Sequence, residues 1–329
     1  MSTDWAAKIP NLPFEDSYIE SSLINPFREQ VDEKSRSLRT QWFGTPTATE
    51  EERLRGIDCA KIVCQIFPDS DPDDLVILTI LCECSFLLDD RVGFDEYDSP
   101  EDLQSHISRF DRILETGRAE TPEPGLETAL AECLQRIYPR QSHSWRRRMR
   151  QNFLDCSFAM AIELDNRREG HFPGLQEYIS MRRNTVALYI FLDLVEFMQR
   201  TELSDALYDS TEMCDLRESW VDIAAWVNDM ASYHKEDAAG EVNLIHVIRA
   251  EKGLTLVAAF DEVARMIESR VTDYIEAEHS LKASSAYRHS TDSERDAVDI
   301  VVQTVRNGLG MYVRLHRESP RYANQDSRV

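Results

Sequence analysis

Three oxygen-bearing side chains recur at every fourth residue between Val227 and Asp237, in the stretch V-N-D-M-A-S-Y-H-K-E-D. On a helix, Asn228, Ser232 and Glu236 share one face, because residues four apart lie one turn above each other. An amide oxygen, a hydroxyl and a carboxylate are hard ligands, which suit Mg²⁺ far better than zinc. The spacing therefore predicts a divalent-cation site on a helix, and a solvated helix end is the plainer alternative.

Five positions of this stretch together form a longer and more specific pattern. Asn228, Asp229, Ser232, Lys235 and Glu236 read N-D-x-x-S-x-x-K-E, which resembles the metal-binding signature of class I terpene cyclases. The resemblance implies that the amide, hydroxyl and glutamate carboxylate bind Mg²⁺ and that the lysine helps to bind a diphosphate.

A second acidic cluster, Asp89 and Asp90, follows a run that is apolar on nearly all sides. Asp89 shares a helical face with Leu78 and Cys82, so we expect it to point inward. A helix C-terminus disfavours negative charge, so nearby cations must offset that cost. The pair resembles the aspartate-rich motif of the same family, which implies that both aspartates bind Mg²⁺.

This motif departs from the usual D-D-x-x-D or D-D-x-x-x-D/E after its first two acids. Gly93 and Phe94 stand where the third acid falls, and the next acids are Asp95 and Glu96. The resemblance does not assign a role to Asp95 or Glu96.

Arg182 precedes Asn228 by 46 residues, in a segment that resembles the region of bacterial-type terpene cyclases carrying a diphosphate-sensing arginine. A guanidinium presents a planar fork of donors to phosphate oxygens and keeps its charge when buried. The adjacent Arg183 is the alternative. The resemblance also makes Thr185 and Val186 the linker and effector positions at a helix break, where a main-chain carbonyl faces the substrate.

Near the C-terminus, Arg321 and Tyr322 follow Pro320. They resemble the family's R-Y pair, whose side chains both bind diphosphate oxygens upon closure. Relatives frequently have Trp a few residues earlier, where this chain has Leu315.

The resemblance covers most of the chain and implies a Mg²⁺-dependent terpene cyclase, with three Mg²⁺ ions or with Mn²⁺ as a substitute. Metal and arginine charge would stabilise the leaving diphosphate of a linear isoprenoid, so that the allylic C–O bond breaks to give a carbocation. Farnesyl diphosphate is favoured on family frequency, with geranylgeranyl diphosphate as the alternative. Aromatic faces stabilise cations; Phe86 is the first candidate, and the others are Tyr189, Phe191, Trp220 and Trp226.

The elements that must position these residues are helices, because apolar residues recur at spacings of 3 and 4 and only 11 glycines and 12 prolines occur. No linker divides the chain, which predicts one all-α domain over 1–329, with an extended strip over 1–22 and a flexible tail over 323–329. The resemblance implies a helical bundle around a central active-site cavity. The helices are expected at about 25–43, 49–66, 72–90, 100–117, 125–138, 175–185, 187–200, 212–236, 254–283 and 292–318.

The composition limits the kinds of partner and the cell compartment that we expect for this chain. A net charge of −23 argues against a nucleic-acid or anionic-membrane surface. Seven cysteines, several of them inside apolar runs, indicate reduced core thiols in a cytoplasmic protein. We find no signal peptide and no apolar run long enough to span a bilayer. A homodimer is compatible with the sequence.

Two alternatives belong to other functional classes. A chain-elongating prenyltransferase would carry two D-D-x-x-D sites, whereas this chain has the N-D-x-x-S-x-x-K-E stretch in place of the second. A non-catalytic helical isoprenoid-binding protein could keep the fold without the reaction.

Overall fold

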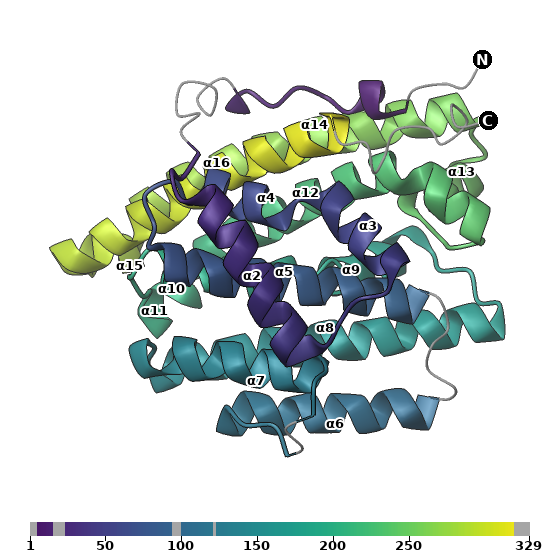
Figure 1. Ribbon diagram of the computed structural model, residues 1–329. Helices are drawn as coiled ribbons and strands as arrows, with labels where there is room; N and C mark the ends of the chain where they lie inside the picture. Colours follow the sequence, from purple (N-terminus) through teal and green to yellow (C-terminus); the bar gives the residue numbers. More distant parts are fainter. Residues whose placement is uncertain (1–4, 16–23, 94–99, 121–122, 319–329) are drawn as a thin grey trace. The chain divides into compact units, whose positions relative to one another are not determined.

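The computed structural model describes residues 5–15, 24–93, 100–120 and 123–318, apart from the side chains of 88–93, 100–102 and 318. Every regular element in these ranges is a helix, which confirms the expected all-α class (Figure 1). The chain forms two compact units. The first comprises Met1–Ser21, Asp165–Tyr189 and Leu203–Val329, and the second comprises Ser22–Leu164 and Ile190–Glu202. A single domain over 1–329 stays a prediction.

The first unit is organised around α12 (Thr211–Ala239), the longest of its helices. This helix packs along α14 (Leu256–Ala283) and also contacts α9 (Leu175–Thr185), α13 (Leu244–Lys252) and α16 (Asp292–Glu318). The short helices α11 (Asp205–Tyr208) and α15 (Ser285–His289) also belong to this unit. Side chains on several faces of α12 are therefore buried.

Local sequence fixes both ends of α12. The Ser210 side chain accepts a hydrogen bond from the Met213 main-chain N–H over 3.3 Å, which caps the first turn. Gly240 ends the helix in the left-handed region with a φ of 71°, a conformation that glycine adopts without a Cβ clash. The helix spans the expected range 212–236 and extends it by a few residues.

An N-terminal segment, residues 5–15, packs on the same unit. It contains the 3₁₀ helix η1 (Ala6–Lys8), and the Trp5 ring stacks on Phe260 of α14 with centroids 4.1 Å apart. Arg317, near the end of α16, donates to the Glu15 carboxylate over 2.5 and 2.9 Å and to the Pro10 carbonyl over 2.9 Å. The segment therefore holds the C-terminal part of α16.

The second unit surrounds α5 (Pro72–Gly93), which contacts α2 (Arg28–Phe43), α3 (Ala48–Ile57), α4 (Cys59–Ile66) and α7 (Leu126–Ile137). It also contains α6 (Pro100–Thr116), η2 (Tyr138–Arg140) and the larger parts of α8 (His143–Glu169) and α10 (Leu188–Met198). Asp71 accepts from the Asp73 main-chain N–H over 2.9 Å, as a residue preceding a helix that starts with proline should. Leu75, Leu78 and Ile80 are fully buried, as the apolar run predicts.

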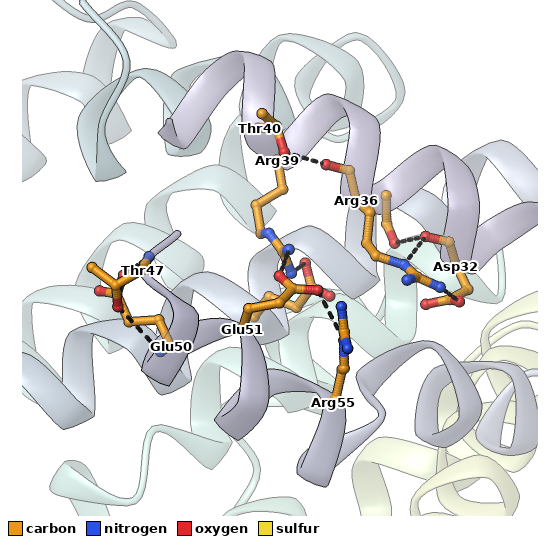
Figure 2. Close-up of polar contacts among 10 residues, drawn as sticks. Asp32, Arg36, Arg39, Thr40, Thr47, Glu50, Glu51 and Arg55 are labelled. Atoms are coloured by element: carbon orange, nitrogen blue, oxygen red, sulfur yellow. Dashed lines mark hydrogen bonds and ion pairs between the residues drawn. The ribbon is translucent and has the colours of Figure 1, made fainter. Parts of the chain in front are cut away.

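Polar side chains join α2 to α3 in this unit. The buried Arg39 donates to Glu51 over 2.6 Å, and Thr47 and Glu50 form a capping box at the start of α3 (Figure 2). A second ion pair joins Arg39 to Glu83 of α5 over 3.1 Å. Arg39 therefore connects three helices through two carboxylates.

Three expectations need correction. The helix expected over 49–66 is two helices, because Asp58 takes a left-handed conformation with a φ of 55° and its carboxylate caps the second one through the Lys61 N–H. The helix that was expected to end at Asp90 continues to Gly93. Helix α13 was not predicted, although Asn243 caps it through the Ile245 N–H over 2.8 Å.

None of the described helices combines the length and the apolar character that a bilayer span requires.

Candidate active site

The three expected cation ligands follow one another along α12. Asn228 is half-buried, and Ser232 and Glu236 follow at one-turn intervals toward the end of the helix. The Ser232 hydroxyl donates to the Asn228 main-chain carbonyl over 2.7 Å. This bond uses the hydroxyl proton, so the lone pairs of the oxygen can still bind a cation.

Glu236 is held by Asn243, which lies in the connection between α12 and α13. The Asn243 side-chain amide donates to a Glu236 carboxylate oxygen over 2.6 Å and to the Asp229 main-chain carbonyl over 2.7 Å. Its own oxygen caps α13. One fully buried asparagine therefore sets the position of the carboxylate and starts the next helix.

Glu236 has an unusual affinity for protons. Burial raises the pKa of its carboxyl to about 7, and the negative charge of Asp229 acts in the same direction. The positive charge of Arg182 and the hydrogen bond from Asn243 oppose that rise. Burial therefore disfavours the ionised carboxylate, and a bound cation would stabilise it.

Arg182 lies on α9 and contacts the first two residues of the α12 pattern. Its Nη2 donates to Asn228 Oδ1 over 2.7 Å, and its Nε donates to Asp229 Oδ1 over 2.9 Å. The other Asp229 oxygen accepts from the Tyr178 hydroxyl over 2.9 Å. A weaker bond of 3.4 Å joins Arg182 to the Thr185 hydroxyl. The buried Asp229 carboxylate thus orients the guanidinium toward Asn228.

The neighbouring Arg183 turns to a different set of partners. Its guanidinium makes two bonds to the buried Asp222 carboxylate, over 2.7 and 2.9 Å, and also contacts Glu218. Arg270 of α14 donates to the same Asp222 over 2.9 Å. Arg183 therefore belongs to an ion-pair network among α9, α12 and α14, which favours Arg182 as the arginine of the site.

A helix break follows Arg182, where the sequence predicted one. Helix α9 ends at Thr185 and α10 begins at Leu188, with Val186 and Ala187 between them. Ala187 has a φ of 61°, which is uncommon for a residue with a Cβ. Such a break leaves main-chain groups without helical partners, as an effector carbonyl requires.

The remaining predicted residues are placed less completely. Lys235 is exposed on α12, and Phe86 is half-buried on α5. Asp89 and Asp90 lie in the last turns of α5, but their side chains are outside the described set. The other four predicted residues lie wholly outside the described residues: Asp95, Glu96, Arg321 and Tyr322.

The other aromatic candidates differ in their surroundings. Trp220 is fully buried, and its indole N–H donates to the Val305 carbonyl of α16 over 2.9 Å, so it joins two helices. Trp226 is also buried. Tyr189 and Phe191 are half-buried near the start of α10. The burial of these rings does not test whether they stabilise a carbocation, so this role stays a prediction.

Four residues of the site were not given their present roles by sequence reasoning. Asp229 was only a position in the motif, and Tyr178, Asn243 and His316 had no role. His316 Nε2 lies 3.1 Å from the Asn228 side-chain nitrogen. For Asn243 a signal existed, since an asparagine before the apolar run L-I-H-V-I is typical of a helix N-cap.

The residues present fit a divalent cation. Asn228, Ser232 and Glu236 offer an amide oxygen, a hydroxyl and a carboxylate from successive turns of one helix. Mg²⁺ prefers such oxygen ligands and keeps part of its water shell. Burial raises the pKa of Glu236, and a cation bound at its carboxylate would favour the ionised form.

Comparison with known proteins gives consistent matches. Residues 81–273 match the family model described as terpene synthase family 2, C-terminal metal binding. Epi-isozizaene synthase of Streptomyces coelicolor is 30% identical over 310 residues, which cover 91% of this chain and 85% of the relative. The (+)-T-muurolol synthase of Roseiflexus castenholzii, named as cyclising (2E,6E)-farnesyl diphosphate, is 27% identical over 78% of this chain and 79% of the relative.

Solved structures of terpene synthases also match the fold of this chain. Linalool/nerolidol synthase from Streptomyces clavuligerus, in complex with 2-fluorogeranyl diphosphate, aligns with a TM-score of 0.80 at 18% identity. The alignment covers 89% of this chain and 99% of that chain. At this identity the likeness concerns the fold, which is the all-α class I terpenoid synthase fold.

Fold and matches together define a class I terpene synthase of the bacterial type, a carbon–oxygen lyase that acts on phosphates. The chain belongs to terpene synthase family 2. This confirms the resemblance found in the sequence. The matched region is the metal-binding region of the family, so the enzyme depends on a divalent metal.

Proposed function

We propose that the protein is a Mg²⁺-dependent cyclase that ionises farnesyl diphosphate and closes the resulting carbocation to a terpene hydrocarbon or alcohol, releasing diphosphate. The observation that carries this proposal is the contact of Arg182 with Asn228 and Asp229. It brings a phosphate-binding guanidinium to the first of three oxygen ligands on α12.

Each side chain of this group has a distinct task. Asn228, Ser232 and Glu236 hold Mg²⁺, and the geometry of α12 keeps them in one row. Arg182 binds diphosphate oxygens, with Asp229 and Tyr178 fixing its approach. When bound, Mg²⁺ supplies the positive charge that stabilises a departing diphosphate.

Other residues extend the proposal beyond this group. Asp89 and Asp90 are proposed as further Mg²⁺ ligands, in line with the three-ion set of the family. Lys235, Arg321 and Tyr322 are proposed to bind diphosphate. The oxygen ligands on α12 are also compatible with Mn²⁺.

Near the reacting carbon, main chain and aromatic side chains are proposed to act. Thr185 links the arginine to the break between α9 and α10, and the carbonyl of Val186 faces the forming cation. Phe86 would stabilise that cation through its ring face.

The substrate is proposed from the relatives. The Roseiflexus castenholzii relative is named for cyclising farnesyl diphosphate, which supports a C15 substrate. One methylene in an apolar wall changes discrimination by only about 1–3 kcal/mol, so geranylgeranyl diphosphate is the alternative to test.

The experiment incubates purified protein and Mg²⁺ with farnesyl or geranylgeranyl diphosphate, measures diphosphate release, and identifies products by gas chromatography–mass spectrometry. We expect a cyclic C15 product and a loss of about 10²-fold or more in Asn228→Ala, as for removal of one electrostatic stabiliser. Asn307→Ala is the matched control, since Asn307 lies on α16 and accepts from Gln303. It should retain parental turnover.

The other outcomes are equally informative. A cyclic C20 product without a C15 product would identify geranylgeranyl diphosphate, in place of farnesyl diphosphate, as the substrate. In a parallel incubation with added isopentenyl diphosphate, turnover that occurs only with this addition would identify a chain-elongating prenyltransferase. Binding of isoprenyl diphosphate with no Mg²⁺-stimulated release would identify a non-catalytic binding protein and overturn the proposal.

A further inference from the structure

His316 lies against the first of the α12 ligands, although 88 residues separate the two in sequence. It is buried on α16, and its Nε2 is 3.1 Å from the side-chain nitrogen of Asn228. Its other ring nitrogen, Nδ1, is 2.8 Å from the main-chain carbonyl oxygen of Tyr312, one turn earlier on the same helix. The imidazole therefore bridges its own helix and the amide of Asn228.

The hydrogen-bond partners define the protonation pattern of this bridge. A carbonyl oxygen only accepts, so Nδ1 must carry the proton in the bond to Tyr312. In a neutral imidazole, Nε2 is then an acceptor, and its partner must be the NH₂ end of the Asn228 amide. The oxygen end of that amide consequently points to the opposite side.

Arg182 gives an independent reason for the same amide orientation. A guanidinium has donors only, so its Nη2 must face the amide oxygen of Asn228, 2.7 Å away. The two ends of an asparagine amide have nearly the same shape, and a flip would exchange the oxygen for nitrogen. A cation binds the oxygen and not the NH₂, so a flipped amide is no ligand.

The imidazole itself is well fixed. Its ring packs on the Tyr312 ring with centroids 4.1 Å apart. The next residue, Arg317, is held by the Glu15 carboxylate and the Pro10 carbonyl of the N-terminal segment. Contacts on both sides of His316 therefore limit the movement of this turn of α16.

We propose that His316 is a positioning residue that keeps the amide oxygen of Asn228 directed at the cation. The proposal rests on the proposed function, in which Asn228 is a cation ligand. Arg182 has a second task there, because its guanidinium also binds diphosphate. The His316 imidazole is bonded to Tyr312 and Asn228, so it preserves the amide orientation when Arg182 turns to the substrate.

The test separates the hydrogen bond from the packing. His316→Phe keeps a ring but removes the acceptor, whereas His316→Gln can place its side-chain oxygen near the former Nε2. Cation binding is measured as the loss of the free Mn²⁺ signal in electron paramagnetic resonance, with MnCl₂ and inorganic diphosphate. Loss of an outer partner of a metal ligand costs about 10–100-fold in affinity.

We expect His316→Phe to weaken Mn²⁺ binding by about 10–100-fold and His316→Gln to restore most of it. Parental affinity in His316→Phe overturns the proposal, as does equal weakening in both variants, which would point to packing alone. Asn228→Ala distinguishes a failure of the proposed cation site from a failure of the role of His316 alone. If it binds Mn²⁺ with parental affinity, the proposed cation site fails and the role of His316 fails with it. If only His316→Phe is unaffected, the proposed function stands.

A second measurement reads the protonation of the histidine ring in the unsubstituted protein. Nitrogen-15 spectra of the histidine rings report which ring nitrogen carries the proton, and the spectrum of His316→Gln assigns the signal. We expect the Nδ1–H form at His316. The Nε2–H form would make Nε2 a donor toward Asn228 and would overturn the proposal.

Discussion

The Nε of Arg182 donates to Oδ1 of Asp229 over 2.9 Å, and this carboxylate is almost completely buried. A buried carboxylate that keeps its charge needs such a partner, because an unpaired charge in the protein interior is very costly. Asp229, the second residue of the α12 pattern, therefore positions the arginine while its neighbours are proposed to bind the cation.

The two adjacent arginines should respond differently to the same substitution. In Arg182→Lys, the fork that joins Asn228 and Asp229 is lost, and diphosphate release should fall by about 10²–10³-fold. In Arg183→Lys, the two bonds to Asp222 are lost, so unfolding free energy should fall by about 1–3 kcal/mol while turnover stays near the parental value. Initial rates and urea denaturation measure both effects. The reverse pattern would assign the site to Arg183.

Asn243 should contribute to stability through two separable functions. Asn243→Ala removes the donors to Glu236 and Asp229 and the cap of α13, so the free energy of unfolding should fall by about 2 kcal/mol. Asn243→Ser keeps a capping oxygen and should recover about 1 kcal/mol of that loss. Urea denaturation measures both. Equal stability of the alanine and serine variants would show that the cap contributes nothing.

Glu83 should make the protein less stable as the pH rises. Burial raises the pKa of this carboxyl from 4.5 to about 7, and the charge of Arg39 opposes the rise only in part. The folded state thus holds a proton that the unfolded state has released. The contribution of Glu83 to stability is full below pH 4.5 and is lost, by on the order of 3 kcal/mol, as the pH rises from 4.5 through 7.

The side chain of Glu83→Gln is a neutral amide that does not ionise, so the stability of this variant relative to the parent should increase between pH 5 and pH 8. Thermal unfolding at several pH values measures the difference. Arg39 keeps its pair with Glu51 in this variant, which limits the structural change. Parallel curves for the two proteins would show that another group causes the pH dependence.

The helix break beside Val186 should be conformationally strained at Ala187. A left-handed conformation costs a residue with a Cβ about 1–2 kcal/mol, and glycine escapes that cost while losing more entropy on folding. Ala187→Gly should therefore raise the free energy of unfolding by about 0.5 kcal/mol. Ala187→Val should lower it by about 1 kcal/mol or more, because a β-branched residue fits this region poorly. A valine variant as stable as the parent would contradict the assigned backbone geometry.

Local signals account for the parts of the fold that the sequence predicts well. Apolar periodicity gives most of the long helices, although α8 was not among those expected, and the ends of α12 follow from Ser210 and Gly240 within a few residues. The division at Asp58 was missed, because its left-handed conformation interrupts a pattern that is helical on both sides. Helix α13 was also missed, although its asparagine cap is visible in the sequence.

The sequence by itself determined the all-helical class, the family, and the row of Asn228, Ser232 and Glu236, because spacing along one helix fixes which side chains share a face. Only the tertiary structure decided that Arg182 contacts this row while Arg183 turns to Asp222, since adjacent residues on a helix point in directions about 100° apart. It also placed His316 against Asn228. That contact depends on how α16 packs on α12, and no local pattern contains such long-range packing.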